Sequence, residues 1–295
     1  MKTTKTTGLI LSLVFSFAFG FVLDSPIAFA QKNKDKPAPV GPLLTRTTTR
    51  HENRRFAYGG TVTIVGAPAG SITIQGWDRN EVDVTAEIEL HAPSEVDLAK
   101  LSVVNNFVLD EDTNHIRVLT TGTHDQSLMK RLGKAFPRNL SALPWKIDYR
   151  VRVPALTDLE VSEGIGPIKL SGVEGALHVN ALESDAVLWL TGGDASITIQ
   201  RGSIYFGVPA RGWHGLGADV KLAGGALTIE FPAEFSADIN ATVLRLGKVE
   251  TAYHNLEARE RNSITPASVR ARAGSGGATL SFTVGDGAIT IRQMQ

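Results

Sequence analysis

The sequence predicts an all-β fold, a β-solenoid built from short strands that glycines separate, and three observations support this. β-Branched apolar and polar residues alternate with period two in many short segments, as in half-buried strands. The chain has 29 glycines, many of them between these segments. Between residues 159 and 206, short apolar units recur about every nine to ten residues. Strands this short cannot bury an apolar face alone, but stacked turns of a coil bury a continuous apolar column.

The first 30 residues have the three-part form of a secretory signal. Basic residues precede an apolar run from Leu9 to Leu23, and Ala28-Phe29-Ala30 follows, so we expect cleavage before Gln31. The run is about 15 residues long, shorter than the roughly 20 that a membrane-spanning helix needs. A removed signal is therefore favoured over an uncleaved anchor. The mature chain is expected to be exported to the periplasm, cell surface or medium, with no transmembrane segment.

Composition excludes several classes of protein. The chain has no cysteine, so neither disulfides nor thiolate metal sites support the fold. Lys and Arg together number 30, as do Asp and Glu, which argues against a nucleic-acid partner. Stability must come from packing and strand ladders.

Residues 31–55 are predicted to be a disordered basic linker. Basic residues outnumber acidic ones there, prolines interrupt the chain, and no apolar periodicity is present. Peripheral contact with anionic lipid or acidic polysaccharide is one interpretation of this charge. A solvated spacer is the favoured one.

The domain proper is predicted to span residues 56–295 and to begin with short strands. Ser94 to Val104 is the best helix candidate, with Ser94 as its N-cap. Asp110 to Asn114 is expected to form a hairpin turn between two further strands. The expected strands are residues 61–65, 71–74, 82–86, 107–109, 116–119 and 147–153.

Residues 120–146 break this pattern and are expected to form an inserted, amphipathic and basic lid or loop. The repeat then begins, and its units pair into a period near 19 to 20 residues. Beyond residue 220 the repeat is looser, and Tyr253 to Ala273 is expected to be a protruding loop or irregular turn. The repeating units are Leu159/Val161, Ile168/Leu170, Leu177/Val179, Val187/Leu188/Leu190, Ile197/Ile199 and Ile204/Phe206.

These features resemble a family of exported bacterial proteins called putative adhesins, adhesin-like domains of unknown function. The resemblance rests on Gly70-Ser71-Ile72-Thr73-Ile74-Gln75-Gly76-Trp77-Asp78-Arg79, on the ladder from Leu159 to Phe206, and on the closing segment from Gly276 to Ile291. It covers about residues 56–295 and implies a right-handed β-helix. The chain departs from the family at Ala181 to Asp185, where a glycine-rich turn is usual, and at the inserted lid.

Catalytic chemistry is not expected. The outward middle positions of the repeat, Lys169, His178, Thr198 and Tyr205, include no carboxylate pair for acid and base catalysis. Asp110 and Asp112 alternate as calcium ligands do, but the required glycine and distal glutamate are missing. No two histidines have zinc-motif spacing. We therefore predict no catalytic, cofactor-binding or metal-binding residue.

The candidate ligand contacts are aromatic and basic residues beside glycine-rich turns. Tyr205, Trp213 and His214 form one group, and Trp77 and Arg79 form another. Such aromatic side chains stack on a sugar ring or fill the end of the coil, and packing is the favoured role. Arg270 and Arg272 are expected to be solvated residues at a strand edge.

The sequence favours a non-catalytic protein of the cell envelope or surface. Its rigid surface would bind an envelope protein or a polysaccharide. Two alternatives remain open: a polysaccharide lyase or hydrolase with a charged cleft, and a structural protein that assembles end to end.

Overall fold

The computed structural model describes residues 42–66, 68–261 and 263–294. The signal expected in residues 1–30, its cleavage point and residues 31–41 of the expected linker lie outside these ranges. Within the described ranges no helix is long and apolar enough to cross a membrane. The described chain is mostly β-strand, as predicted, and its strands form one large sheet of mixed direction.

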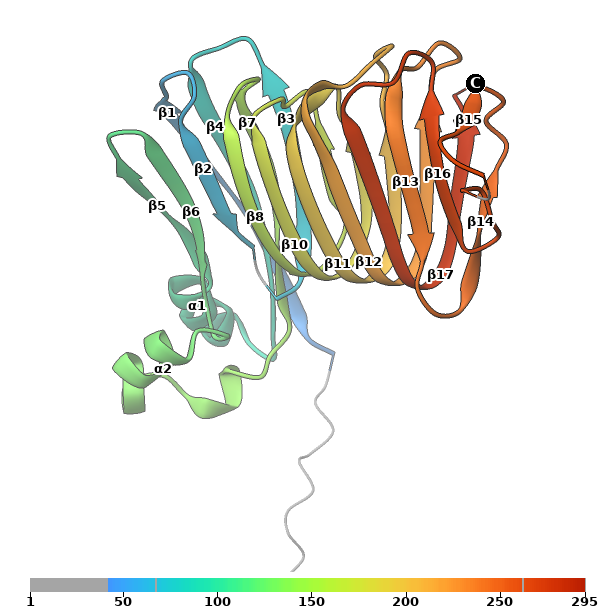
Figure 1. The fold of residues 1–295 in the computed structure, drawn as a ribbon. Helices are drawn as coiled ribbons and strands as arrows, with labels where there is room; N and C mark the ends of the chain where they lie inside the picture. The colour runs from blue at the N-terminus through green and yellow to red at the C-terminus, as the bar shows by residue number, and fades with distance from the viewer. Residues whose placement is uncertain (1–41, 67, 262, 295) are drawn as a thin grey trace, which may run out of the picture. The chain divides into compact units, whose positions relative to one another are not determined.

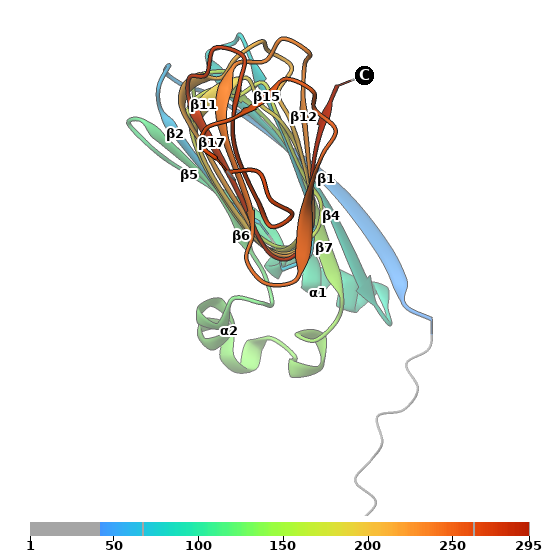
Figure 2. The same cartoon turned by 45° about the vertical axis from the view of Figure 1, so that its right-hand side comes forward.

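The sheet folds over into two layers, because four long strands contribute one half to each layer. Figure 2 shows these layers facing each other. The long strands are β10 (Ala176–Trp189), β11 (Gly192–Gly207), β12 (His214–Phe231) and β17 (Thr279–Gln293).

The first layer follows the order β1, β4, β7, β3, β9, β10, β11, β12, β17 and β14. The second follows β5, β6, β2, β8, β10, β11, β12, β17, β13, β16 and β15. The other first-layer strands are β1 (Leu44–Arg55), β3 (Gly70–Trp77), β4 (Glu81–Ala92), β7 (Trp145–Pro154), β9 (Ile168–Ser171) and β14 (Gly247–Thr251). The other second-layer strands are β2 (Thr61–Val65), β5 (Asn106–Asp112), β6 (His115–Thr121), β8 (Asp158–Ile165), β13 (Ala237–Val243), β15 (Leu256–Ala258) and β16 (Ser268–Ala273).

The core consists of columns of apolar side chains between the layers. Successive passes of the chain pair in parallel, so equivalent residues lie side by side. Leu177 lies beside Leu159, which is 18 residues earlier, so the repeat is slightly shorter than expected. Each fully buried Leu or Ile side chain in these columns contributes about 1.5–3 kcal/mol. The second-layer column holds Leu159, Leu177, Ala195, Ala218 and Leu280, and the first-layer column holds Ile168, Ala186, Ile204, Leu227 and Ile289.

Glycines occupy the bend at which the long strands cross between layers. Gly202, Gly225 and Gly287 lie side by side there with φ of 125°, 140° and 143°. A β-carbon on Gly225 would come within 1.8 Å of the carbonyl oxygen of Gly202. Close approach of the backbones therefore requires glycine at this column, which explains the glycine punctuation of the sequence.

The predicted helix and hairpin are both confirmed. Helix α1 (Glu95–Val104) begins after Ser94, whose hydroxyl accepts a hydrogen bond from the Asp97 amide, and it buries Leu98 and Leu101. Strands β5 and β6 form the hairpin. Figure 1 shows α1 and α2 (Gln126–Leu132) together at one end. Helix α2 and two 3-10 turns, η1 (Gly133–Ala135) and η2 (Arg138–Leu140), occupy the segment expected to be a lid.

The prediction of a disordered linker through residue 55 is wrong for residues 44–55. These residues form β1, which pairs with β4 along its whole length. The strand was missed because its Thr and Arg side chains give no apolar alternation. Tyr253 to Ala273 is also more regular than expected, because β16 pairs with both β13 and β15.

Candidate functional site

Trp213 and Tyr205, which were expected to belong to one group of ligand contacts, lie on opposite sides of the first layer. Trp213 is only 8% exposed, and its indole N–H donates a hydrogen bond of 3.0 Å to the carbonyl oxygen of Gly193. Its ring stacks on Phe206, with centroids 5.9 Å apart. Tyr205 precedes Phe206 on β11 and therefore points to the other side of the layer. Trp213 is a core residue.

The remaining sequence candidates lie apart from each other. His214 is exposed at the start of β12. The Trp77 indole donates a hydrogen bond to the Glu81 carbonyl oxygen, and the guanidinium groups of Arg79 and Arg152 lie 5.1 and 5.6 Å from the ring. Because these contacts hold and cover the Trp77 ring, we assign Trp77 and Arg79 a structural role in stabilising this turn.

Tyr205 instead belongs to an aromatic pair on the outer face of the first layer. Trp189 of β10 and Tyr205 of β11 have ring centroids 5.2 Å apart, and both are half-buried. Trp189 pairs directly with Gly207 on the neighbouring strand, so its ring has room to lie over that glycine. The strands beneath hold both rings at fixed spacing. We call Trp189 and Tyr205 the aromatic platform.

Two charged residues brace the aromatic platform from the next strands. The Tyr205 hydroxyl donates a hydrogen bond to Glu230 on β12. Arg292 on β17 pairs with Glu230, with Nη2 and Oε1 2.5 Å apart. Burial and the hydrogen bond to Glu230 raise the pKa of Tyr205 to about 12, so the phenol stays neutral at physiological pH. Glu230 accepts hydrogen bonds from both Tyr205 and Arg292. The exposed Arg292 therefore lies next to the aromatic platform.

The sequence missed Trp189 because it falls within the apolar unit Val187/Leu188/Leu190. The strict alternation of buried and outward residues along β10 shows which way Trp189 points. Ala186, Leu188 and Leu190 are buried, so Trp189 must point outward. An aromatic residue at an outward strand position is the pattern that would have found it.

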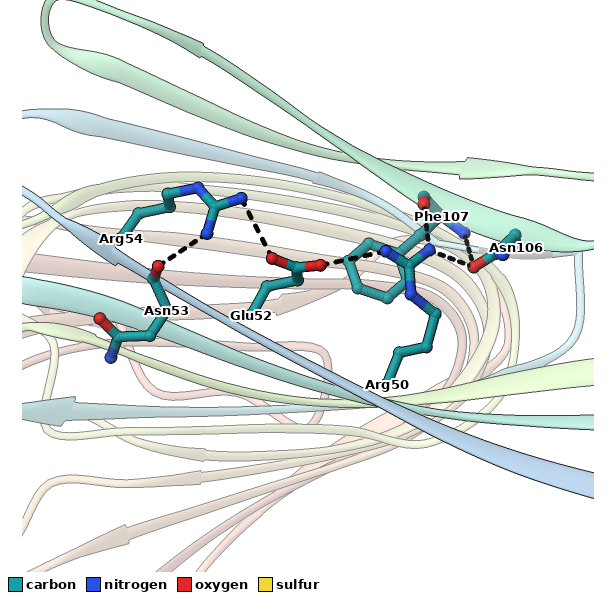
Figure 3. A network of polar contacts seen from close by, with 6 residues as sticks. All are labelled: Arg50, Glu52, Asn53, Arg54, Asn106 and Phe107. Carbon is teal, nitrogen blue, oxygen red and sulfur yellow. Dashed lines mark hydrogen bonds and ion pairs between the residues drawn. The ribbon is translucent and has the colours of Figure 1, made fainter.

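A second polar cluster closes the space between the edge strands β1 and β5. The Arg50 guanidinium donates to the Asn106 side-chain oxygen at 2.6 Å and to the Phe107 carbonyl oxygen at 3.0 Å, and it lies 4.5 Å from the Phe107 ring centroid. Glu52 accepts from Arg50 and also pairs with Arg54. Figure 3 shows this network between the two edges. Its bonds are satisfied internally, which indicates a structural role in joining the layers.

One buried carboxyl has no such partners. Glu163 points into the core at a position that Ala181, Ile199, Leu222 and Val284 fill in other passes, and it is 7% exposed. Neither of its carboxylate oxygens has a hydrogen-bond partner among the described residues. Burial raises the pKa of Glu163 to about 8, so it is mostly protonated at neutral pH.

Metal ligation has no support in the described part of the chain, where no group of three His, Asp or Glu side chains is placed to hold an ion. Asp110 and Asp112, the alternating acids of the hairpin, both pair with Arg117. Their carboxylates act in an ion-pair cluster at the turn.

Comparison of the sequence with models of protein families and with curated proteins finds no match. Several solved structures are similar to the chain. A putative cell adhesion protein from Clostridium sporogenes has a TM-score of 0.44 and 10% identity, over 84% of this chain and 100% of that protein. A putative adhesin from Bacteroides fragilis has a TM-score of 0.29 and 9% identity, over 84% and 97%. For a putative adhesin from Parabacteroides merdae the values are 0.24 and 10%, over 84% and 96%. The second and third of these proteins are named putative adhesins, and the first is named a putative cell adhesion protein.

Proposed function

We propose that this chain is an exported, non-catalytic binding protein of the adhesin type, which holds glycans on the outer face of a right-handed β-solenoid. The aromatic platform carries this proposal. Trp189 and Tyr205 present two rings side by side on a layer whose strands are fixed by in-register pairing. Because the layer holds the rings in place, a sugar that stacks on them costs little ordering of the protein.

The groups around the rings suit a polyhydroxylated ligand. Arg292 supplies hydrogen-bond donors at one side, and the side chain of Glu230 is fixed by Tyr205 and Arg292. Lys169 and Thr228 lie in the same outward row as Tyr205, on β9 and β12. A pyranose ring resting on the platform would therefore have polar groups at its edge.

Export is part of the proposal and rests on the three-part pattern of residues 1–30. Expression in a bacterial host followed by mass spectrometry of the exported fraction tests it. A mature chain beginning at Gln31 is expected. A chain found only in the cytoplasm with Met1 retained would contradict it.

The binding experiment is affinity electrophoresis of the purified protein in gels containing neutral and acidic polysaccharides, with a parallel assay for shorter products. We expect retention by a neutral glycan without product release. Trp189→Ala should weaken that retention at least about tenfold, because stacking area is lost. Trp77→Ala is the control, since its ring is covered by two arginines.

Other outcomes would point to the alternatives. Release of shorter products would favour the polysaccharide lyase or hydrolase. Retention by a neutral glycan that survives Trp189→Ala would rule out the platform as the site. If no glycan is retained and the protein forms concentration-dependent oligomers, the self-assembling envelope protein becomes the better explanation.

A further inference from the structure

We infer that a second site, on the outer face of the second layer, binds the carboxylate of an acidic sugar residue. This inference rests on the proposed function only in taking glycans as the ligand class. The site is a groove of about 780 Å³ that lies over β13, β16 and β17 and beside the chain that follows β15. It is separate from the aromatic platform, which lies on the first layer.

The floor of the groove is polar and regular. Ser281, Asn240 and Arg270 lie side by side on β17, β13 and β16, because these strands pair in register. One step along, Thr283 and Thr242 form a second row. The floor therefore offers hydroxyl and amide groups at strand spacing, which can both donate to and accept from sugar hydroxyls.

Arg270 lines the groove and forms no ion pair among the described residues. Arg272 and Arg259 both approach Asp238, with Nε to Oδ1 3.4 Å apart for Arg272 and Nη2 to Oδ2 3.9 Å apart for Arg259. In the described ranges no carboxylate lies within 4 Å of the Arg270 guanidinium, although Glu257 and Glu260 also line the groove. Arg270 was expected to be a solvated edge residue, but it lines the floor of this polar groove.

The chemistry of these groups selects the ligand. A guanidinium binds a carboxylate through two parallel hydrogen bonds, and such charge-assisted bonds are stronger than neutral ones. The polar side chains of the two strand rows and the carboxylates of Glu257 and Glu260 would form hydrogen bonds with the hydroxyl groups of the sugar. None of the described residues that line the groove is an exposed aromatic or large aliphatic one, so the groove does not suit an apolar peptide side chain. A uronic acid within a polysaccharide combines one carboxylate with several hydroxyls.

The test measures binding of the full chain to polygalacturonate. The methyl ester of polygalacturonate and dextran sulfate are the comparison ligands. We expect the protein to bind polygalacturonate and to bind the ester at least about tenfold more weakly, because the ester lacks the charge. Arg270→Ala should weaken polygalacturonate binding by about tenfold or more. Arg270→Lys, which keeps the charge but not the paired donors, should restore only part of it. Stronger binding of dextran sulfate than of polygalacturonate would contradict a carboxylate site.

Arg201→Ala is the matched control, because Arg201 is exposed on β11 and has no ion pair among the described residues. The inference is overturned if Arg270→Ala binds polygalacturonate as the unmodified protein does, or if Arg201→Ala loses as much. Trp189→Ala separates the two proposals. It should leave polygalacturonate binding by the groove intact, so failure of the groove and failure of the aromatic platform give different patterns.

Discussion

The ring of Trp189 lies so close over Gly207 that a β-carbon on Gly207 would come within 2.7 Å of the ring atom Cε3. Gly207 is buried and pairs directly with Trp189 across β10 and β11. The absence of a side chain at residue 207 therefore determines where the indole rests. The position of one half of the aromatic platform depends on a glycine of the next strand.

Gly207→Ala should displace the Trp189 ring and weaken glycan retention toward the level of Trp189→Ala. The added methyl group overlaps both Trp189 and Tyr205, so we also expect a stability loss of about 1–3 kcal/mol. Affinity electrophoresis and urea denaturation measure the two effects. Gly224→Ala is the control, because a β-carbon on Gly224 would have only one other atom within 4 Å, at 3.9 Å. Equal retention in both variants would show that the ring position does not matter.

Trp213→Ala should destabilise the fold by about 3–5 kcal/mol, as expected for a large buried aromatic side chain. Trp189→Ala should cost less, about 1 kcal/mol, because that ring is only half-buried on the surface. Urea denaturation of both variants checks this order. If Trp213→Ala unfolds like the unmodified protein but loses glycan binding, the assignment of Trp213 to the core is wrong.

Glu163 should make stability depend on pH. Its folded-state pKa of about 8 lies above the value of 4.5 for an exposed glutamate, so the folded state holds the proton more tightly. The stability from this group is fully present below about pH 4.5 and is lost as pH rises to 8, by about 1.4 kcal/mol per pH unit within that window. Urea denaturation at several pH values measures the slope.

Glu163→Gln should remove that slope, and Glu163→Leu should also stabilise the protein by about 1–3 kcal/mol, since no unpaired polar group is then buried. Glu160→Gln on the same strand is the control, because Glu160 is exposed. A pH dependence that persists in Glu163→Gln would assign it to other groups.

Arg50→Ala should loosen the end of the structure at which β1 faces β5. The substitution removes hydrogen bonds to Asn106, Phe107 and Glu52 and the contact with the Phe107 ring, for a loss of about 1–3 kcal/mol. Hydrogen exchange of the β5 amides should speed up more than that of β11. Arg55→Ala serves as the comparison, since Arg55 is exposed and has no ion pair in the described ranges. Unchanged exchange at β5 would show that the network does not hold the layers together.

The local parts of the fold followed from the sequence because neighbouring residues decide them. Alternation between core and solvent specified most strands, Ser94 specified the start of α1, and Asp110 to Asn114 specified the hairpin turn. The repeat between residues 159 and 206 predicted that passes of the chain would stack in register, and the parallel pairings of β8, β10 and β11 confirm it.

Tertiary structure decided the features that depend on pairing between distant segments. Strand β1 has no apolar alternation and exists as a strand through its pairing with β4 and its contacts with β5. Trp213 stacks on Phe206 in the core, whereas Trp189 lies over Gly207 on the outer face. The groove around Arg270 combines strands whose residues are neighbours only after β16 turns back onto β13. Sequence by itself determined most of the strands and which of their faces are apolar, since both depend on local side-chain chemistry. Which surface groups meet depends on long-range register, and only the folded chain sets it.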